Sequence, residues 1–106
     1  MTEAPISLTT PVTILGLAKR PGMTKDRRTV LSLAAEINGS QYEVNLVTKP
    51  GQGIEQALKY LADSGYLTED GNEYRLQVPT WALAKAKGNV VWVHIDDYER
   101  LRGTTT

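Results

Sequence analysis

The residue types that most often carry enzyme chemistry are sparse in this chain. His94 is the single histidine and cysteine is absent, which excludes thiol catalysis and zinc–thiolate sites. His94 and Asp96 would share one face of an extended strand, but two ligands do not make a metal site. Residues 48–53, TKPGQG, lack the Lys-Ser/Thr pair with which a phosphate-binding loop holds phosphate and magnesium. We therefore expect a protein that is not an enzyme and uses no metal or other cofactor.

Cations and large aromatic rings, in contrast, are grouped. Residues 19–28, KRPGMTKDRR, hold five basic side chains against Asp26 alone, and residues 80–89 hold two lysines after Trp81. Single-stranded nucleic acid is bound by cations that follow the phosphates and by rings on which bases stack. Trp92 is equally compatible with covering a small second core or a dimer contact. The grouping predicts a surface that binds single-stranded DNA or RNA, made of Lys19, Arg20, Lys25, Arg27, Arg28, Trp81, Lys85, Lys87 and Trp92.

The overall charge limits this prediction. Twelve acidic and twelve basic residues cancel, which argues against a protein that coats nucleic acid by bulk charge. Between residues 54 and 73 the local balance is acidic, with five carboxylates against Lys59. A neutral chain with a basic loop and an acidic helical end also fits a protein-interaction module, an adaptor or inhibitor that docks a partner or forms a homodimer.

The length and termini indicate one domain. A chain of 106 residues with 41% hydrophobic content fills one core. We expect a flexible tail at 1–10, a domain at 11–102 and a second tail at 103–106. The N-terminus carries Glu3 and Pro5 where a secretory signal would have basic residues and an apolar run, and no stretch is apolar enough to span a membrane. These features favour a cytoplasmic location.

The strongest structural signal is the pair Asn38-Gly39, which is typical of a two-residue type I′ hairpin turn. That turn would place Ile37 opposite Ser40 and would then pair the residues on either side in a fixed register. One face of the hairpin would be apolar and would include Tyr42, and the other would be mostly polar. The expected pairs are Leu31 with Leu46, Ser32 with Asn45, Leu33 with Val44, Ala34 with Glu43, Ala35 with Tyr42, and Glu36 with Gln41.

The remaining elements follow from periodicity and from glycine and proline. Gly16 indicates a bend in the first strand, Gly65 closes the helix, and Asp70-Gly71 makes a turn. Tyr74 falls on the predicted core face of its strand. The order is strand, strand, strand, helix, strand, strand, with strands at 12–20, 73–78 and 90–96 besides the hairpin, a helix at 54–61, and loops at 48–53 and 80–89.

This order resembles that of the OB-fold, a five-stranded antiparallel barrel with its helix between the third and fourth strands. Local sequence is also similar to bacterial single-stranded DNA-binding proteins of this fold, at 14–17 (ILGL), 19–21 (KRP), 30–34 (VLSLA) and 93–97 (VHIDD). The resemblance implies a mainly β, α+β domain. It also implies that the two basic loops flank an oligonucleotide groove, since the corresponding loops of OB-folds do so.

A second resemblance leaves an alternative open. Residues 54–76 look like the recognition helix and wing of winged-helix DNA-binding domains. In that case residues 26–37 would form a helix that ends at Asn38-Gly39, and Ser40 with Glu43 would cap another. The winged helix implies binding to duplex DNA, although its recognition helix would carry only Lys59 as a basic residue.

Overall fold

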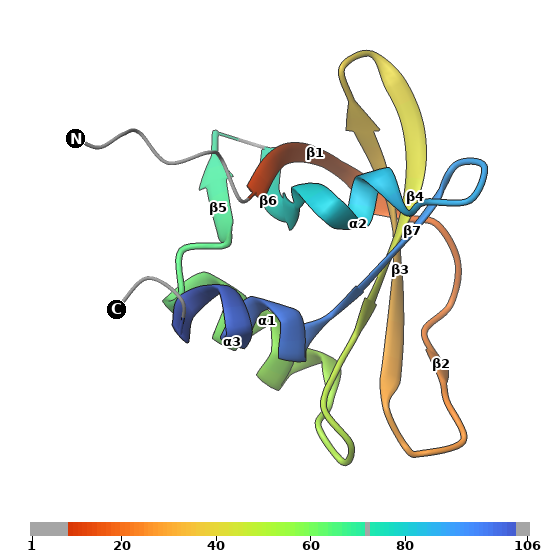
Figure 1. Ribbon diagram of the computed structural model, residues 1–106, viewed down its shortest axis with the longest axis vertical. Helices are drawn as coiled ribbons and strands as arrows, with labels where there is room; N and C mark the ends of the chain where they lie inside the picture. Colours follow the sequence, from red (N-terminus) through yellow and green to blue (C-terminus); the bar gives the residue numbers. More distant parts are fainter. Residues whose placement is uncertain (1–8, 72, 104–106) are drawn as a thin grey trace.

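One twisted sheet forms most of the molecule. The computed structural model describes residues 9–71 and 73–103. Neighbouring strands follow the order β5-β6-β1-β3-β4-β7, and the two-residue β2 also pairs with β3 (Figure 1). The elements are β1 (Thr9–Leu17), β2 (Gly22–Met23), β3 (Thr29–Ile37), β4 (Ser40–Val47), α1 (Ile54–Asp63), β5 (Leu67–Asp70), β6 (Glu73–Pro79), α2 (Thr80–Ala84), β7 (Val90–His94) and α3 (Ile95–Gly103).

The hairpin at Asn38-Gly39 is confirmed. Asn38 has φ 52° and Gly39 has φ 85°, so both central residues adopt the left-handed conformation that a type I′ turn requires. Every expected pair is present, from Ile37 opposite Ser40 to Leu31 opposite Leu46. The winged-helix alternative is therefore wrong, because the segments that it makes helical are the strands β3 and β4.

Strand alternation builds the core. The inward-facing residues of β3, β4 and β7 are fully or almost fully buried: Leu31, Leu33, Ala35, Ile37, Val44, Leu46, Val91 and Val93. Two predictions about which side chains are buried are wrong. Tyr74, predicted to be a core residue, is 49% exposed. On the second face of the hairpin, Ser32 and Asn45 are buried, and the Ser32 hydroxyl donates a 2.6 Å hydrogen bond to the Asn45 Oδ1, which satisfies both groups.

The elements around the helix α1 follow the sequence signals. Gly65 has φ 81°, and the Tyr66 N–H donates to the Leu61 carbonyl over 2.9 Å, as in a glycine-closed helix end. The turn at Asp70-Gly71 is also confirmed, and it joins β6 to β5, a strand that the sequence did not indicate. Near Gly16 the register between β1 and β3 shifts, which is the expected bend. None of the described helices has the length and apolarity needed to cross a bilayer.

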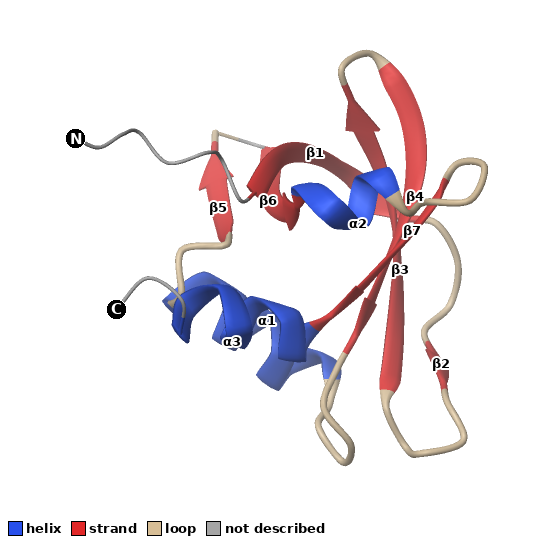
Figure 2. Cartoon of the chain, in the orientation of Figure 1, coloured by secondary structure: helices blue, strands red, loops and turns tan. Residues whose placement is uncertain are grey.

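The expected closed, antiparallel, five-stranded barrel is wrong in two respects. β7 pairs with β4 in parallel, with Val44 opposite Val91, and the sheet is not closed into a barrel. The expected last strand, 90–96, is shorter than predicted because α3 begins at Ile95 and takes Asp96 into a helix. Likewise, part of the expected loop 80–89 is the helix α2. Figure 2 shows these helices among the strands.

Side chains connect α3, the helix that follows the edge strand β7, to β6 near the other end of the sheet. Tyr98 of α3 is fully buried, and its hydroxyl donates a 2.6 Å hydrogen bond to the backbone carbonyl of Gln77 on β6. The ring of Tyr66 packs against Tyr98 with a centroid separation of 4.4 Å. Burial raises the pKa of the Tyr98 phenol, so this donor keeps its proton throughout the ordinary pH range. Tyr98 thus links α3 to β6 where backbone pairing is missing.

The boundaries of the domain differ slightly from those expected. Thr9 and Thr10, which we placed in an N-terminal tail, belong to β1 and pair with Pro79 and Val78. Gly103, which we placed in the second tail, is the last residue of α3. The rest of the two predicted tails, residues 1–8 and 104–106, lies outside the described residues.

Asn38→Ala is expected to lower the free energy of unfolding by about 1 to 2 kcal/mol, because alanine disfavours the left-handed conformation that the turn requires. Asn38→Gly is the matched control and should stay within about 0.5 kcal/mol of the parent, since glycine adopts this conformation readily. Urea denaturation measures both. Equal loss of stability in the two variants would contradict the assignment of the turn.

Tyr98→Phe is expected to cost about 1 to 2 kcal/mol, because the Gln77 carbonyl loses its donor in a buried position. Tyr42→Phe is the control, since the Tyr42 side chain is partly exposed and its hydroxyl forms no hydrogen bond within residues 9–71 and 73–103. Thermal denaturation of both variants provides the test. If Tyr98→Phe is as stable as Tyr42→Phe, the hydroxyl does not hold the sheet ends together.

Candidate nucleic-acid interface

Four of the predicted contact residues line one open cavity. This cavity, here called the tryptophan pocket, has a volume of about 340 Å³ and lies between α2 and β7. Both tryptophans are substantially exposed, Trp81 at 39% and Trp92 at 52%. The two rings therefore present apolar surface to solvent although they come from different elements. The lining residues are Trp81, Ala82, Lys85, Ala86, Lys87, Val90 and Trp92.

The helix α2 forms one side of the tryptophan pocket. It begins directly after Pro79, and its buried residue Ala82 fixes which side packs against the core. Trp81 and Lys85 are four residues apart, which puts both on one face of a helical turn. The Lys85 Nζ lies 5.4 Å from the centroid of the Trp81 ring, within reach of a cation–π interaction. The sequence predicted these side chains, but it assigned them to a loop.

The turn after α2 supplies Lys87. The Val90 N–H donates to the Lys87 carbonyl over 3.1 Å, and Gly88 has φ 59° between them. The turn is fastened to the sheet because the Glu43 N–H donates to the Asn89 carbonyl over 2.8 Å. Lys87 is thus presented by a short, hydrogen-bonded turn at the mouth of the pocket.

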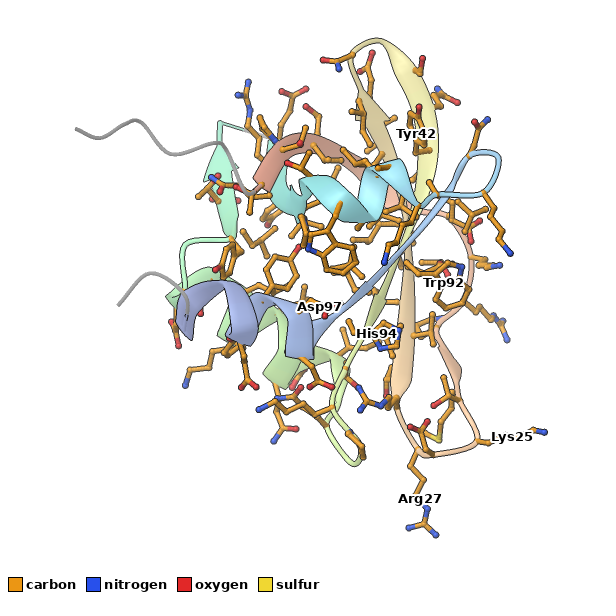
Figure 3. All side chains as sticks on the ribbon, in the orientation of Figure 1. Lys25, Arg27, Tyr42, Trp92, His94 and Asp97 are labelled. Carbon is orange, nitrogen blue, oxygen red and sulfur yellow. The ribbon has the colours of Figure 1, made fainter. Side chains whose placement is uncertain are left out.

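Strand alternation places Trp92 on the outer face of β7. Its neighbours Val91 and Val93 are fully buried, whereas Trp92 and His94 are exposed. Figure 3 shows Trp92 and His94 projecting from β7 away from the core. In the parallel register Trp92 is opposite Asn45, so the ring lies over the outer face of the hairpin.

A second concave surface continues from the tryptophan pocket. It has a volume of about 390 Å³, and Val90 lines both cavities. Its apolar part includes Leu15, which is 52% exposed, and Tyr42. Glu43 also lines it, and the carboxylate of Glu43 pairs with the Lys19 Nζ over 3.3 Å. Because Val90 lines both, the two hollows form a continuous concave path from α2 across β7 and β4.

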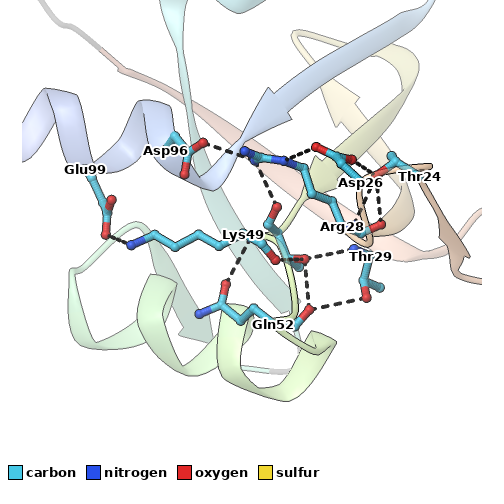
Figure 4. A network of polar contacts seen from close by, with 9 residues as sticks. Thr24, Asp26, Arg28, Thr29, Lys49, Gln52, Asp96 and Glu99 are labelled. Atoms are coloured by element: carbon cyan, nitrogen blue, oxygen red, sulfur yellow. Dashed lines mark hydrogen bonds and ion pairs between the residues drawn. The ribbon is translucent and has the colours of Figure 1, made fainter.

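Arg28, predicted as a nucleic-acid contact, is occupied inside the protein. Its guanidinium pairs with Asp26 over 3.0 Å and with Asp96 over 3.1 Å, and it donates to the Thr48 carbonyl over 3.1 Å (Figure 4). The side chain is only 18% exposed. The hydrogen bond with Asp96 is the main cause that raises the pKa of Arg28. Arg28 thereby ties the basic loop to the start of α3.

The basic loop is a compact turn that directs two other cations outward. The Thr24 N–H donates to the Arg28 carbonyl over 2.8 Å, and the Arg27 N–H donates to the Thr24 carbonyl over 3.1 Å. Arg27 has φ 66°, so the chain reverses at this residue. Figure 3 shows Lys25 and Arg27 pointing into solvent at the tip of the loop, well separated from Trp92.

The remaining cation of the predicted set lies elsewhere. Arg20 is exposed and immediately precedes Pro21, which lines a different cavity from the tryptophan pocket. Arg20, Lys25 and Arg27 have no ion-pair partner within the parts of the chain that are described. The structure therefore separates the predicted set into the pocket residues, two cations at the loop tip, Arg20, and two cations held in ion pairs, Lys19 and Arg28.

Sequence reasoning missed the polar network that positions the basic loop. Thr48 is buried and accepts the Thr29 N–H over 2.9 Å, and Lys49 pairs with Glu99 of α3 (Figure 4). These contacts join residues far apart in the chain, so no local pattern marks them. Asp96 lies in α3 and pairs with Arg28, so the expectation that it shares a strand face with His94 is wrong. Over residues 9–71 and 73–103, no three potential metal ligands come together.

No protein-family model, curated protein or solved structure matches this chain. The functional proposal therefore rests on the geometry of its own residues.

Asp26→Asn is expected to destabilise the loop in a pH-dependent way. The hydrogen bond from Thr24 is the main cause that lowers the pKa of Asp26 below its ordinary value of 3.8, and Arg28 lowers it further. A carboxylate with a depressed pKa stabilises the fold above its unfolded pKa and loses this effect as pH falls through its folded pKa. Denaturation should therefore show a less stable variant at pH 7 and no difference once Asp26 is protonated.

Glu36→Gln is the control for this experiment, because Glu36 is an exposed carboxylate of β3 that forms no ion pair with the described residues. It should follow the parent protein at every pH. A stability difference between Asp26→Asn and the parent that persists unchanged at low pH would refute the electrostatic account of the loop.

Proposed function

We propose that this protein binds single-stranded DNA or RNA through the tryptophan pocket and catalyses no reaction on it. The observation that carries the proposal is the convergence of Trp81, Trp92, Lys85 and Lys87 on one open cavity. These four side chains come from a helix, a turn and a strand, so their meeting is a property of the fold. They are also the residue types that single strands require.

The pocket chemistry suits an unpaired base and its phosphate. Stacking of a base on an aromatic side chain is worth about 1 to 3 kcal/mol, and it needs a ring that is exposed on one face. The cavity of about 340 Å³ falls within the roughly 300 to 1,000 Å³ range of small-ligand pockets, so it accommodates a base. Lys85 and Lys87 supply positive charge at the same place, where a phosphate would follow the base.

The order of the strands also supports the proposed nucleic-acid-binding surface. The long strands β1, β3, β4, β6 and β7, with α1 between the third and fourth of these, follow the OB-fold order. OB-folds are partly open barrels that bind oligonucleotides on their second and third strands and on the loops between strands one and two and between strands four and five. The corresponding parts here are the β3–β4 face, residues 18–28 and residues 80–89. We infer an OB-like domain that is open between β7 and β5, the edge strand beside β6.

The cations outside the pocket have two roles: some contact phosphates, and others hold the protein's own segments in place. Lys25 and Arg27 contact flanking phosphates from the tip of the basic loop, because they are exposed and directed outward. Lys19 and Arg28 instead hold their segments in place through ion pairs. Because the whole chain is neutral, affinity depends on these local charges and falls steeply as salt rises.

Titration with a dT oligomer tests the proposal. Binding should quench tryptophan fluorescence at low salt, since both rings lie in the pocket. Trp92→Ala should weaken binding of a labelled oligomer about 5- to 100-fold, the equivalent of one lost stacking contact. Lys85→Ala with Lys87→Ala should reduce the salt slope by about 0.7 for each phosphate contact removed.

Arg75→Ala is the control for the lysine variants, because it also removes one exposed positive charge but lies on β6, outside the pocket. It should bind within about twofold of the parent by the same assay. A parent protein that shows no quenching and no binding at low salt would rule out the proposed function and leave a protein-interaction module as the explanation of the exposed rings.

A further inference from the structure

A second, mostly apolar cavity lies away from the tryptophan pocket. It is a groove of about 640 Å³ between α1 and the strands β1, β3, β5 and β6, here called the α1–β1 groove. Aliphatic side chains and Tyr74 make up its lining, apart from Lys59. It is open to solvent, since Leu17 is 64% exposed and Tyr74 is 49% exposed. Exposed apolar grooves with polar residues at their rims are typical of interaction sites, so the groove is a candidate interface.

The two sides of the groove differ in charge. On the β1 side, Pro21 lines the groove and follows Arg20, which is exposed and has no ion-pair partner in the described parts of the chain. On the β5–β6 side, Glu69 lies directly opposite Tyr74 in the strand register and accepts a hydrogen bond from its hydroxyl. Arg20 is therefore a cation beside the β1 side and Glu69 an anion beside the β5–β6 side, while Lys59 of α1 lines the groove itself.

This asymmetry fits a second copy of the same chain. In a two-fold dimer the same patch faces itself, so a contact between two residues occurs twice with the partners exchanged. Arg20 of each copy would meet Glu69 of the other while the apolar linings cover each other. The cancelling charges of the whole chain add no long-range repulsion between two copies.

We propose that the α1–β1 groove is the interface of a two-fold homodimer. The groove and the tryptophan pocket share no lining residue, so formation of the dimer leaves the tryptophan pocket of each copy open. The dimer carries two pockets, each outside the interface. The proposal stands independently of nucleic-acid binding, because it rests on different residues.

Sedimentation velocity over a range of concentrations tests the dimer. The parent should reach twice the mass of one 11.7 kDa chain at high concentration. Leu17→Asp should reduce it to the mass of a single chain, because the substitution places a carboxylate inside the apolar interface. Leu15→Asp is the matched control: Leu15 lies on the same strand and is 52% exposed, but it lines the other concave surface, and this variant should remain dimeric.

A charge exchange keeps the test informative if Leu17→Asp does not fold. Arg20→Glu and Glu69→Arg should each weaken the dimer at least tenfold, and the double variant should restore it, because the exchanged pair recreates the attraction. Circular dichroism checks that each variant is folded. A parent that has the mass of one chain at every concentration, or a double variant no more dimeric than the singles, would overturn the proposal and assign the groove to another occupant.

Discussion

The chain reversal at Asn38-Gly39 is the constraint on which the rest of this structure depends. Two consecutive residues in the left-handed conformation set the register of β3 and β4, and the register decides which side chains enter the core. A shift by one residue would move Leu33 and Val44 to the outer face. Because β7 pairs with β4 in parallel, the same register also determines that Trp92 points outward while Val91 and Val93 are buried.

The open edge of the sheet and the candidate site have one cause. β7 is five residues long, gives way to α3 and forms one edge of the sheet, while β5, which pairs with β6, forms the other. Tyr98 then connects α3 to β6 from the inside through its hydrogen bond to Gln77. On the outside, α2 follows β6 and contributes Trp81 and Lys85 to the pocket.

The sequence predicted those features of the fold that depend on residues close together in the chain. The hairpin, the glycine that closes α1 and the turn at Asp70-Gly71 are short-range signals, and all three are confirmed. The start of α3 was missed because Ile95 continues a segment, 90–95, that is rich in β-branched residues and favours a strand. The parallel pairing of β4 with β7 and the Arg28–Asp96 ion pair join distant segments, so no local pattern shows them. The tryptophans were identifiable as candidates, but their convergence with Lys85 and Lys87 depends on α2.

Photo-cross-linking most directly tests the central claim, which is that single strands bind at the tryptophan pocket. A dT oligomer substituted with 5-iodouracil would be irradiated with the parent protein, and the modified peptides would be mapped by mass spectrometry. Adducts on Trp81 and Trp92 are the predicted result, because both rings line the cavity where a base would stack. Adducts confined to the α1–β1 groove, or none at low salt, would contradict the account.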